Sequence, residues 1–183
     1  ASINGILIFK DNFVPGTPVA KALCLNDVVL DVSITANRPD AMSVVGIARE
    51  LNAIYRLEMK EQDLSFKTTN ENVENFVSVE NKAFDLCPRY IACYVSDVKI
   101  KEAPLWMKRR LALTGMDSIS NIVDITNYVL KEFGQPMHAF DCNYLEGNEI
   151  NVRRAADGEK IVTLDSQEYE LNSNNLVICD GVK

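Results

Sequence analysis

Thr126, Asn127 and His138 are the side chains whose types and spacing could do chemistry. His138 is the only histidine and lies in FGQPMHAFD, residues 133–141, where Gly134 predicts the end of a helix. Thr126 and Asn127 fall inside that helix, where both types are mediocre because their side chains compete for backbone hydrogen bonds. Two adjacent ones suggest that polar groups are wanted there. The alternatives are a structural or surface histidine, a back-bonded threonine and an exposed asparagine.

Other catalytic and binding patterns are missing from the sequence. Neither GxGxxG nor GxxxxGK[ST] occurs, so no nucleotide-phosphate loop is indicated. Serine and aspartate are too plentiful for spacing to select a catalytic triad. The cysteines are odd in number and form no CxxC pair, which argues against a disulfide framework or a metal site and for a reducing, cytosolic compartment. They are Cys24, Cys87, Cys93, Cys142 and Cys179.

Composition and charge indicate a globular domain with an acidic balance. Hydrophobic residues make up 47% and charged residues 25%, and the formal net charge is −7. Such a chain is not expected to bind nucleic acid, DNA included, strongly as a whole, so any contact must be local. The only basic clusters, KRR at 108–110 and RR at 153–154, are interpreted as a solvated helix face and a solvated strand end. No run reaches the ~18 apolar residues of a membrane span, and no signal peptide is indicated. The missing initial Met suggests a processed or excised chain.

Hydrophobic periodicity predicts the elements that would position the polar side chains. Residues 27–35 alternate like a half-buried strand, and 41–56 have helical spacing with Asp40 or Ser43 as the cap. NRPD, between them, is interpreted as a turn and helix start. Further helices are predicted at 104–114 and 122–133. Strands are predicted at 5–9, 76–81, 88–100, 149–155, 159–165, 167–172 and 175–180.

The predicted fold class is α+β, with mixed or antiparallel sheets and a few helices. The polar, weakly patterned residues 58–75 are the predicted connector between a piece at 1–57 and a piece at 76–183. The chain stops shortly after an apolar strand, so we expect it to be truncated inside the second piece.

Four stretches carry a resemblance to a known family. NIVDITNYVLKEFGQPMHAFD at 121–141 resembles the beta subunit of bacterial phenylalanyl-tRNA synthetase. DVSITANRPDAMSVVGIAREL at 31–51 is similar to that family's segment before its editing module. RYIACYVSDVKI at 89–100 and VRRAADGEKIVTLDSQEYELNSNNLVICD at 152–180 resemble strands of the module itself. Departures are Ala36, Ala41 and Ser166, where the family usually has Pro, Cys and Gly.

The resemblance implies a ligase that joins phenylalanine to its tRNA in the cytoplasm, using ATP and magnesium. It implies a heterotetramer of two alpha and two beta subunits, with the synthetic site in alpha. The beta subunit's editing module hydrolyses tyrosyl-tRNA. By this resemblance, 1–57 is the end of the preceding domain and 76–183 the first part of the editing module. No cofactor is then expected in this chain, which should be inactive alone.

The resemblance also carries roles onto three residues of this sequence. His138 becomes a catalytic residue of the editing reaction, and Thr126 and Asn127 become binding residues of its pocket. No metal ligand is implied. The alternative is a non-catalytic scaffold module of the same subunit that orders it and touches tRNA.

Overall fold

The structure is a computed structural model that describes residue 9 and residues 12–182. It contains helices and small mixed sheets, which confirms the α+β prediction. By backbone contacts the chain divides into two compact units, each made of two separate stretches. Unit 1 comprises 1–61 and 99–139, and unit 2 comprises 62–98 and 140–183.

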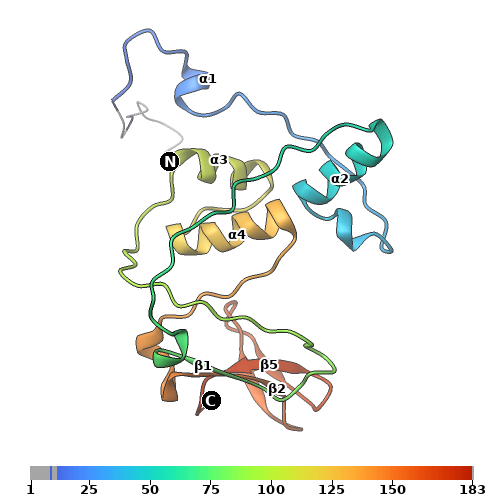
Figure 1. The fold of residues 1–183 in the computed structure, drawn as a ribbon, viewed down its shortest axis with the longest axis vertical. Coiled ribbons are helices and arrows are strands. Elements are labelled where there is room, and N and C mark those ends of the chain that lie inside the picture. The colour runs from blue at the N-terminus through green and yellow to red at the C-terminus, as the bar shows by residue number, and fades with distance from the viewer. Residues whose placement is uncertain (1–8, 10–11, 183) are drawn as a thin grey trace. The chain divides into compact units, whose positions relative to one another are not determined.

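Unit 1 is helical. Its main elements are α2 (Val44–Tyr55), α3 (Leu105–Leu113) and α4 (Asn121–Phe133), and both α2 and α3 contact α4 (Figure 1). A small apolar core lies between α3 and α4, because one face of α3 is buried there. This core consists of Ala103, Met107 and Leu111, with Met116 and Tyr128 packed against it. The single turn α1 (Val19–Ala22) belongs to the same unit.

The start of α2 confirms both the predicted helix and one of its two candidate caps. Ser43 Oγ accepts a hydrogen bond of 2.9 Å from the backbone N–H of Gly46. A Cβ built on Gly46 would lie 2.0 Å from the carbonyl oxygen of Asp40, so only glycine fits at this close approach. Asp40 lies in the 3₁₀ turn Pro39–Ala41, as expected of a turn and helix start, and accepts from Arg38 at 2.8 and 3.0 Å.

Unit 2 contains a three-stranded sheet in the order β1 (Ser78–Asn81), β2 (Glu149–Arg154), β5 (Leu176–Cys179). β1 runs parallel to β2, and β5 runs antiparallel to it. β2 is therefore paired on both edges, and Ile150 and Val152 on it are buried.

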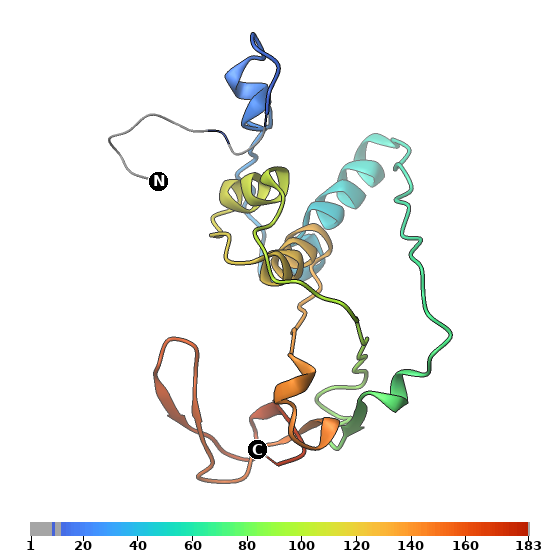
Figure 2. The same ribbon diagram turned by 90° about the vertical axis from the view of Figure 1, so that its left-hand side faces the viewer.

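A separate two-stranded hairpin belongs to the same unit. β3 (Lys160–Val162) pairs with β4 (Glu168–Glu170) in antiparallel register, and every residue of both strands is exposed. Figure 2 shows the hairpin as an arm that leaves the sheet. With β2 and β5 it confirms the four strands predicted for 149–180.

Two strand predictions are wrong. No strand forms at 27–35 or at 88–100, and both run as irregular chain. Val28 and Leu30 in the first segment are 80% and 68% exposed. A strand needs a neighbour for its hydrogen bonds, and no described strand lies beside either segment. The predicted strand 5–9 lies outside the described residues apart from Phe9.

The division into units does not follow the predicted sequence domains. Each unit combines an early and a late stretch, so the boundaries near 61, 98 and 139 cut across the predicted piece 76–183. Residues 58–75 carry only the 3₁₀ turn Val73–Asn75. The predicted boundaries 1–57 and 76–183 concern the order of domains in a longer protein and stay a prediction.

Candidate functional site

α4 has defined ends that fix the positions of Thr126 and Asn127. Ser120 caps the first turn, where its Oγ accepts from the backbone N–H of Val123 at 3.4 Å. Gly134 ends the helix in the left-handed region at φ 75°, and its N–H donates to the carbonyl of Leu130 at 2.9 Å. The helix predicted for 122–133 is thus confirmed, and both polar residues lie in its middle.

Asp124 anchors the loop before α4, and the sequence analysis missed it. Its carboxylate is fully buried and accepts from Ser118 Oγ at 2.5 Å and from the N–H of Ile119 at 2.8 Å. An acidic residue in the first turn of a helix is expected from the helix dipole and reads as solvated surface. The structure instead shows a buried carboxylate whose two hydrogen bonds hold the α3–α4 loop onto α4.

The hydroxyl of Thr126 is engaged within its own helix. Thr126 Oγ1 donates to the carbonyl oxygen of Val123 at 2.8 Å, which is the back-bonded arrangement that the sequence left open. The oxygen's remaining lone pairs can still accept a hydrogen bond. Asn127 is half-buried rather than exposed, and its amide offers both a donor and an acceptor.

Tyr128, the next residue, joins α4 to α3. Its hydroxyl accepts from Arg110 Nη1 at 2.7 Å, and its ring meets Trp106 edge to face with centroids 5.4 Å apart. Burial raises the pKa of the Tyr128 phenol, so it stays neutral at neutral pH, and its hydrogen bond raises the pKa of Arg110. Tyr128 therefore ties the middle of α4 to α3.

His138 lies beyond the end of α4 in a stretch without helix or strand, and its side chain is exposed. Unit 1 ends directly after it, at Ala139. The end of α4 lies close to the start of α2, since a Cβ built on Gly134 would be 3.4 Å from Cβ of Ser43. The structure thus makes Thr126 and Asn127 neighbours on one helix and places His138 on the segment that follows it.

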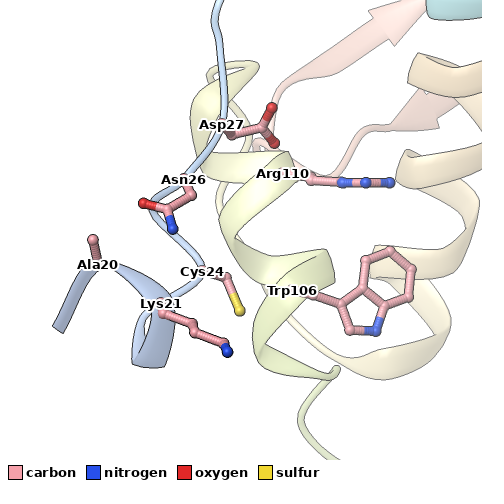
Figure 3. A pocket seen from close by; sticks show the side chains of 7 residues that line it. All are labelled: Ala20, Lys21, Cys24, Asn26, Asp27, Trp106 and Arg110. Atoms are coloured by element: carbon pink, nitrogen blue, oxygen red, sulfur yellow. The ribbon is translucent and has the colours of Figure 1, made fainter. Parts of the chain in front are cut away.

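A cavity of about 220 Å³ lies elsewhere in unit 1, between the stretch around α1 and the exposed side of α3. It holds none of the three predicted residues. In Figure 3 the side chains of Trp106 and Arg110 leave α3 on the side away from Lys21. The carboxylate of Asp27 turns toward Arg110. The polar groups around this cavity do not converge on one point.

The described residues contain no metal cluster, no disulfide and no membrane-spanning helix. In the part of the chain that the structure describes, no three His, Cys, Asp or Glu side chains are grouped so as to hold a metal ion. The five cysteines are all free thiols. Within the described residues no helix is both long and apolar enough to cross a membrane.

The chain matches a known domain family and, over nearly its whole length, known subunits. Residues 86–183 match the B3/4 domain family, and because this is more than half of the chain, the chain belongs to that family. The phenylalanine–tRNA ligase beta subunit of Syntrophus aciditrophicus is 44% identical over 98% of this chain. Those of Clostridium acetobutylicum and Geobacter metallireducens are each 45% identical, over 99% and 100% of it.

These matches confirm the resemblance seen in the sequence, and they cover nearly all of the chain. The chain spans only 22–23% of the length of these relatives. Its relatives are thus parts of an aminoacyl-tRNA synthetase that are several times longer than the chain itself.

Proposed function

We propose that this chain is part of the beta subunit of a phenylalanine–tRNA ligase, and that its local role is to hydrolyse tyrosyl-tRNA. The observation that carries the proposal is the 44–45% identity to such subunits over 98–100% of the chain. The B3/4 match at 86–183 supports it, because this range contains Thr126, Asn127 and His138.

Physical chemistry gives a reason for a second, hydrolytic site. Tyrosine is phenylalanine with one added hydroxyl, and an apolar synthetic pocket rejects such an isostere only by roughly 10²-fold. A separate site that accepts the hydroxyl and cleaves the ester restores accuracy. Its reaction is the attack of water on the ester carbonyl, which releases tyrosine and leaves the terminal ribose hydroxyl on the tRNA.

The three residues have complementary capacities for this reaction. Thr126 has its proton committed to Val123, so its oxygen serves as an acceptor for the water or the substrate ammonium. The amide of Asn127 donates to the ester oxygen, where negative charge develops in the transition state. His138 takes the proton of the attacking water or orients it, since imidazole can do either near neutral pH.

The whole-enzyme properties belong to the same proposal. Charging with phenylalanine would take place in the cytoplasm with ATP and magnesium, at a site in the alpha subunit of an assembly of two alpha and two beta chains. ATP would drive amino-acid activation at that other site, and no step of the hydrolysis above uses it.

A deacylation time course in the complete enzyme tests the proposal. His138→Ala should slow hydrolysis of tyrosyl-tRNA by about 10- to 10³-fold and leave phenylalanine charging nearly unchanged. Met137→Ala is the matched control, because Met137 is an exposed neighbour in the same stretch. Thr126→Val removes one hydroxyl at nearly constant volume and should also slow hydrolysis. Unchanged deacylation in His138→Ala would refute the catalytic role.

The non-catalytic alternative also has an observation in its favour. The exposure of His138 and the back-bonded hydroxyl of Thr126 suit a module that only orders the subunit and touches tRNA. In that case both variants would hydrolyse tyrosyl-tRNA at the wild-type rate. The chain alone, incubated with ATP, phenylalanine and tRNA, should give no charged product under either proposal.

A further inference from the structure

The stretch 99–110, KIKEAPLWMKRR, has a charge opposite to that of the chain as a whole. It carries five cationic side chains and one acidic side chain in a protein of net charge −7. The cations are Lys99, Lys101, Lys108, Arg109 and Arg110. In sequence the cluster reads as a solvated helix face, and the structure shows that it is more organised than that.

Among the described residues, three of these five cations, Lys99, Lys101 and Arg109, have no carboxylate partner. Lys108 pairs with Glu102 at 3.0 Å, which uses the only acidic residue of the stretch. Arg110 contacts neutral groups: it donates to the Tyr128 hydroxyl at 2.7 Å and lies 5.6 Å from the centroid of the Trp106 ring. The carboxylates of Asp27 (Figure 3) and Glu132 lie near enough to offset part of its charge.

The guanidinium of Arg109 is left partly unsatisfied by the described residues. Its Nε is buried and has no hydrogen-bond acceptor among the described residues. A buried donor without a partner is costly and rare in folded proteins. No carboxylate of the described residues pairs with this guanidinium. A phosphate oxygen from solvent would meet the terminal nitrogens of this half-buried guanidinium, not the buried Nε itself.

Lys99 and Lys101 are exposed and stand on a fixed backbone. The side chain and backbone of Asn121, the first residue of α4, tie this segment down through three hydrogen bonds. Asn121 Nδ2 donates to the carbonyl of Lys99 at 3.1 Å, and Asn121 Oδ1 accepts from the N–H of Lys101 at 3.0 Å. The N–H of Asn121 donates to the carbonyl of Lys101 at 2.8 Å.

We propose that Lys99, Lys101 and Arg109 form a surface that binds the phosphate backbone of RNA. Resting on the proposed function, this RNA is the tRNA whose ester is hydrolysed. Phosphate contacts fix the register of a bound nucleic acid without reading its sequence, and an otherwise acidic protein needs such a local contact to hold it.

The packing of α3 on α4 favours RNA over an acidic protein segment as the occupant. Leu111 and Tyr128 lock the two helices together, so RNA held on the basic stretch is in register with Thr126 and Asn127. A fixed position relative to α4 matters for a substrate whose reactive ester must reach that helix. Binding of a protein partner does not require it.

The test is the salt dependence of tRNA binding by the full-length ligase assembled from beta and alpha subunits. The variants are the double change Lys99→Ala/Lys101→Ala and the single change Arg109→Gln. The control is Lys60→Ala/Lys67→Ala, which removes the same charge from two exposed lysines of the 58–75 region. Uncharged tRNA is the probe, and binding is measured from about 0.05 to 0.3 M salt.

Each lost phosphate contact lowers the slope of log affinity against log salt by about one. The double variant should therefore lower it by about two and weaken binding by roughly 10-fold or more near 0.1 M salt. The Arg109 variant should lower it by about one, and the control should change neither quantity. In tyrosyl-tRNA deacylation the double variant should raise KM and keep kcat within about twofold.

Equal slopes in the double variant and wild type, or an equal loss in the control, would overturn the proposal. Weakened assembly with the alpha subunit at unchanged tRNA binding would also overturn it and assign the surface to an acidic protein partner. Failure of the proposed function is seen separately, as absence of deacylation by wild type. The salt slopes still decide whether the surface binds RNA.

Discussion

α4 and the segment 27–35 belong to the same unit and both have regularly spaced apolar residues, yet they differ in where their backbone hydrogen bonds go. α4 closes its bonds within itself and has a partner at each end, in Ser120 and Gly134. The segment 27–35 has no strand beside it, and Val28, Leu30 and Val32 are 80%, 68% and 46% exposed. A helix is completed by one stretch of chain, whereas a strand needs two.

Unit 2 shows the same contrast between two strand-like sequences. β2 has neighbours on both edges and buries Val152 completely. The part of segment 88–100 that lies in this unit has no described strand beside it, and its Ile91 and Val95 are 65% and 70% exposed. Apolar alternation therefore shows that a stretch suits a sheet, and pairing decides whether it joins one.

The largest effect that tests this contrast is expected in the α3–α4 core. Leu111 is 1% exposed, so Leu111→Ala should cost about 2–5 kcal/mol of unfolding free energy through lost burial and a cavity. Trp106 is the only tryptophan and lies on α3, so its fluorescence during urea unfolding reports on this unit. Leu113→Ala on the same helix, at 40% exposure, should cost well under half as much. Equal costs would mean that α3 and α4 are not held by this core.

The second largest loss of unfolding free energy is expected when the hydrogen bonds to Asp124 are removed. Asp124→Ala leaves the hydroxyl of Ser118 and the N–H of Ile119 without their buried acceptor, which should cost about 2–3 kcal/mol. The same urea titration measures it. Asp117→Ala, the removal of a nearby exposed carboxylate, should stay within about 0.5 kcal/mol. A small effect at Asp124 would show that α4 depends on its own hydrogen bonds alone.

The sequence predicted the elements whose signals are local. The caps Ser43 and Ser120 and the helix stop at Gly134 lie within one turn of the residues they serve, so α2 and α4 were found with nearly correct ends. The strands of 149–180 were found because turn residues separate them. The pairing of β1 with β2 could not be predicted from local sequence signals, since it joins residues about 70 positions apart in parallel register.

In the candidate site, too, features with a local sequence signal were predictable and features that depend on distant contacts were not. Thr126 and Asn127 were recognised because polar residues in mid-helix conflict with local propensity. The burial of Asp124 depends on Ser118 folding back over α4, and no periodicity in the sequence reports that contact. The burial of the Arg109 Nε likewise depends on what packs over α3, which the sequence does not show. The sequence KRR at 108–110 is therefore interpreted only as solvated surface.

A smaller effect is expected when the cap of α4 is removed. Ser120→Ala should cost about 1 kcal/mol, because the N–H of Val123 loses its acceptor. Amide exchange in the first turn of α4 should accelerate by about fivefold, while the last turn near Gly134 keeps its protection. Ser120→Thr, which can still cap, is the control. Equal acceleration along the whole helix would argue that α4 melts as one unit.

In unit 2, the contacts of Glu159 after β2 can be tested by changing the pH. Arg153 donates twice to this carboxylate, at 2.9 Å each, and the N–H of Ala156 donates at 2.8 Å, which together lower the pKa of Glu159 to about 2. Because the folded pKa is depressed, the stabilisation is complete above about pH 4.5 and is lost as the pH falls toward 2.

The two side chains of this pair are 27–29% exposed, so we expect only about 1 kcal/mol. The amide resonance of Ala156, followed by NMR, should titrate with a midpoint near 2. Glu159→Gln should abolish that titration, and Glu170→Gln in the exposed hairpin should not change it. A midpoint near the ordinary range of glutamate, about 4.3, would mean that the ion pair does not hold the turn after β2.

The smallest effect should come from the apolar residues of 27–35. Leu30→Ser should change the unfolding free energy by less than about 0.5 kcal/mol, because a side chain already 68% exposed loses little by becoming polar. Hydrogen exchange provides a second measurement. Amides 29–34 should exchange at close to the rates of an unstructured peptide, while those in the middle of α4 are protected. Leu111→Ser, the same substitution in the buried core, is the comparison and should have a large effect.

If Leu30→Ser cost more than about 1 kcal/mol, or if alternate amides of 29–34 were protected, the segment would be a paired strand in solution. The contrast with α4 would then disappear, and the alternation in its sequence would have been the better guide.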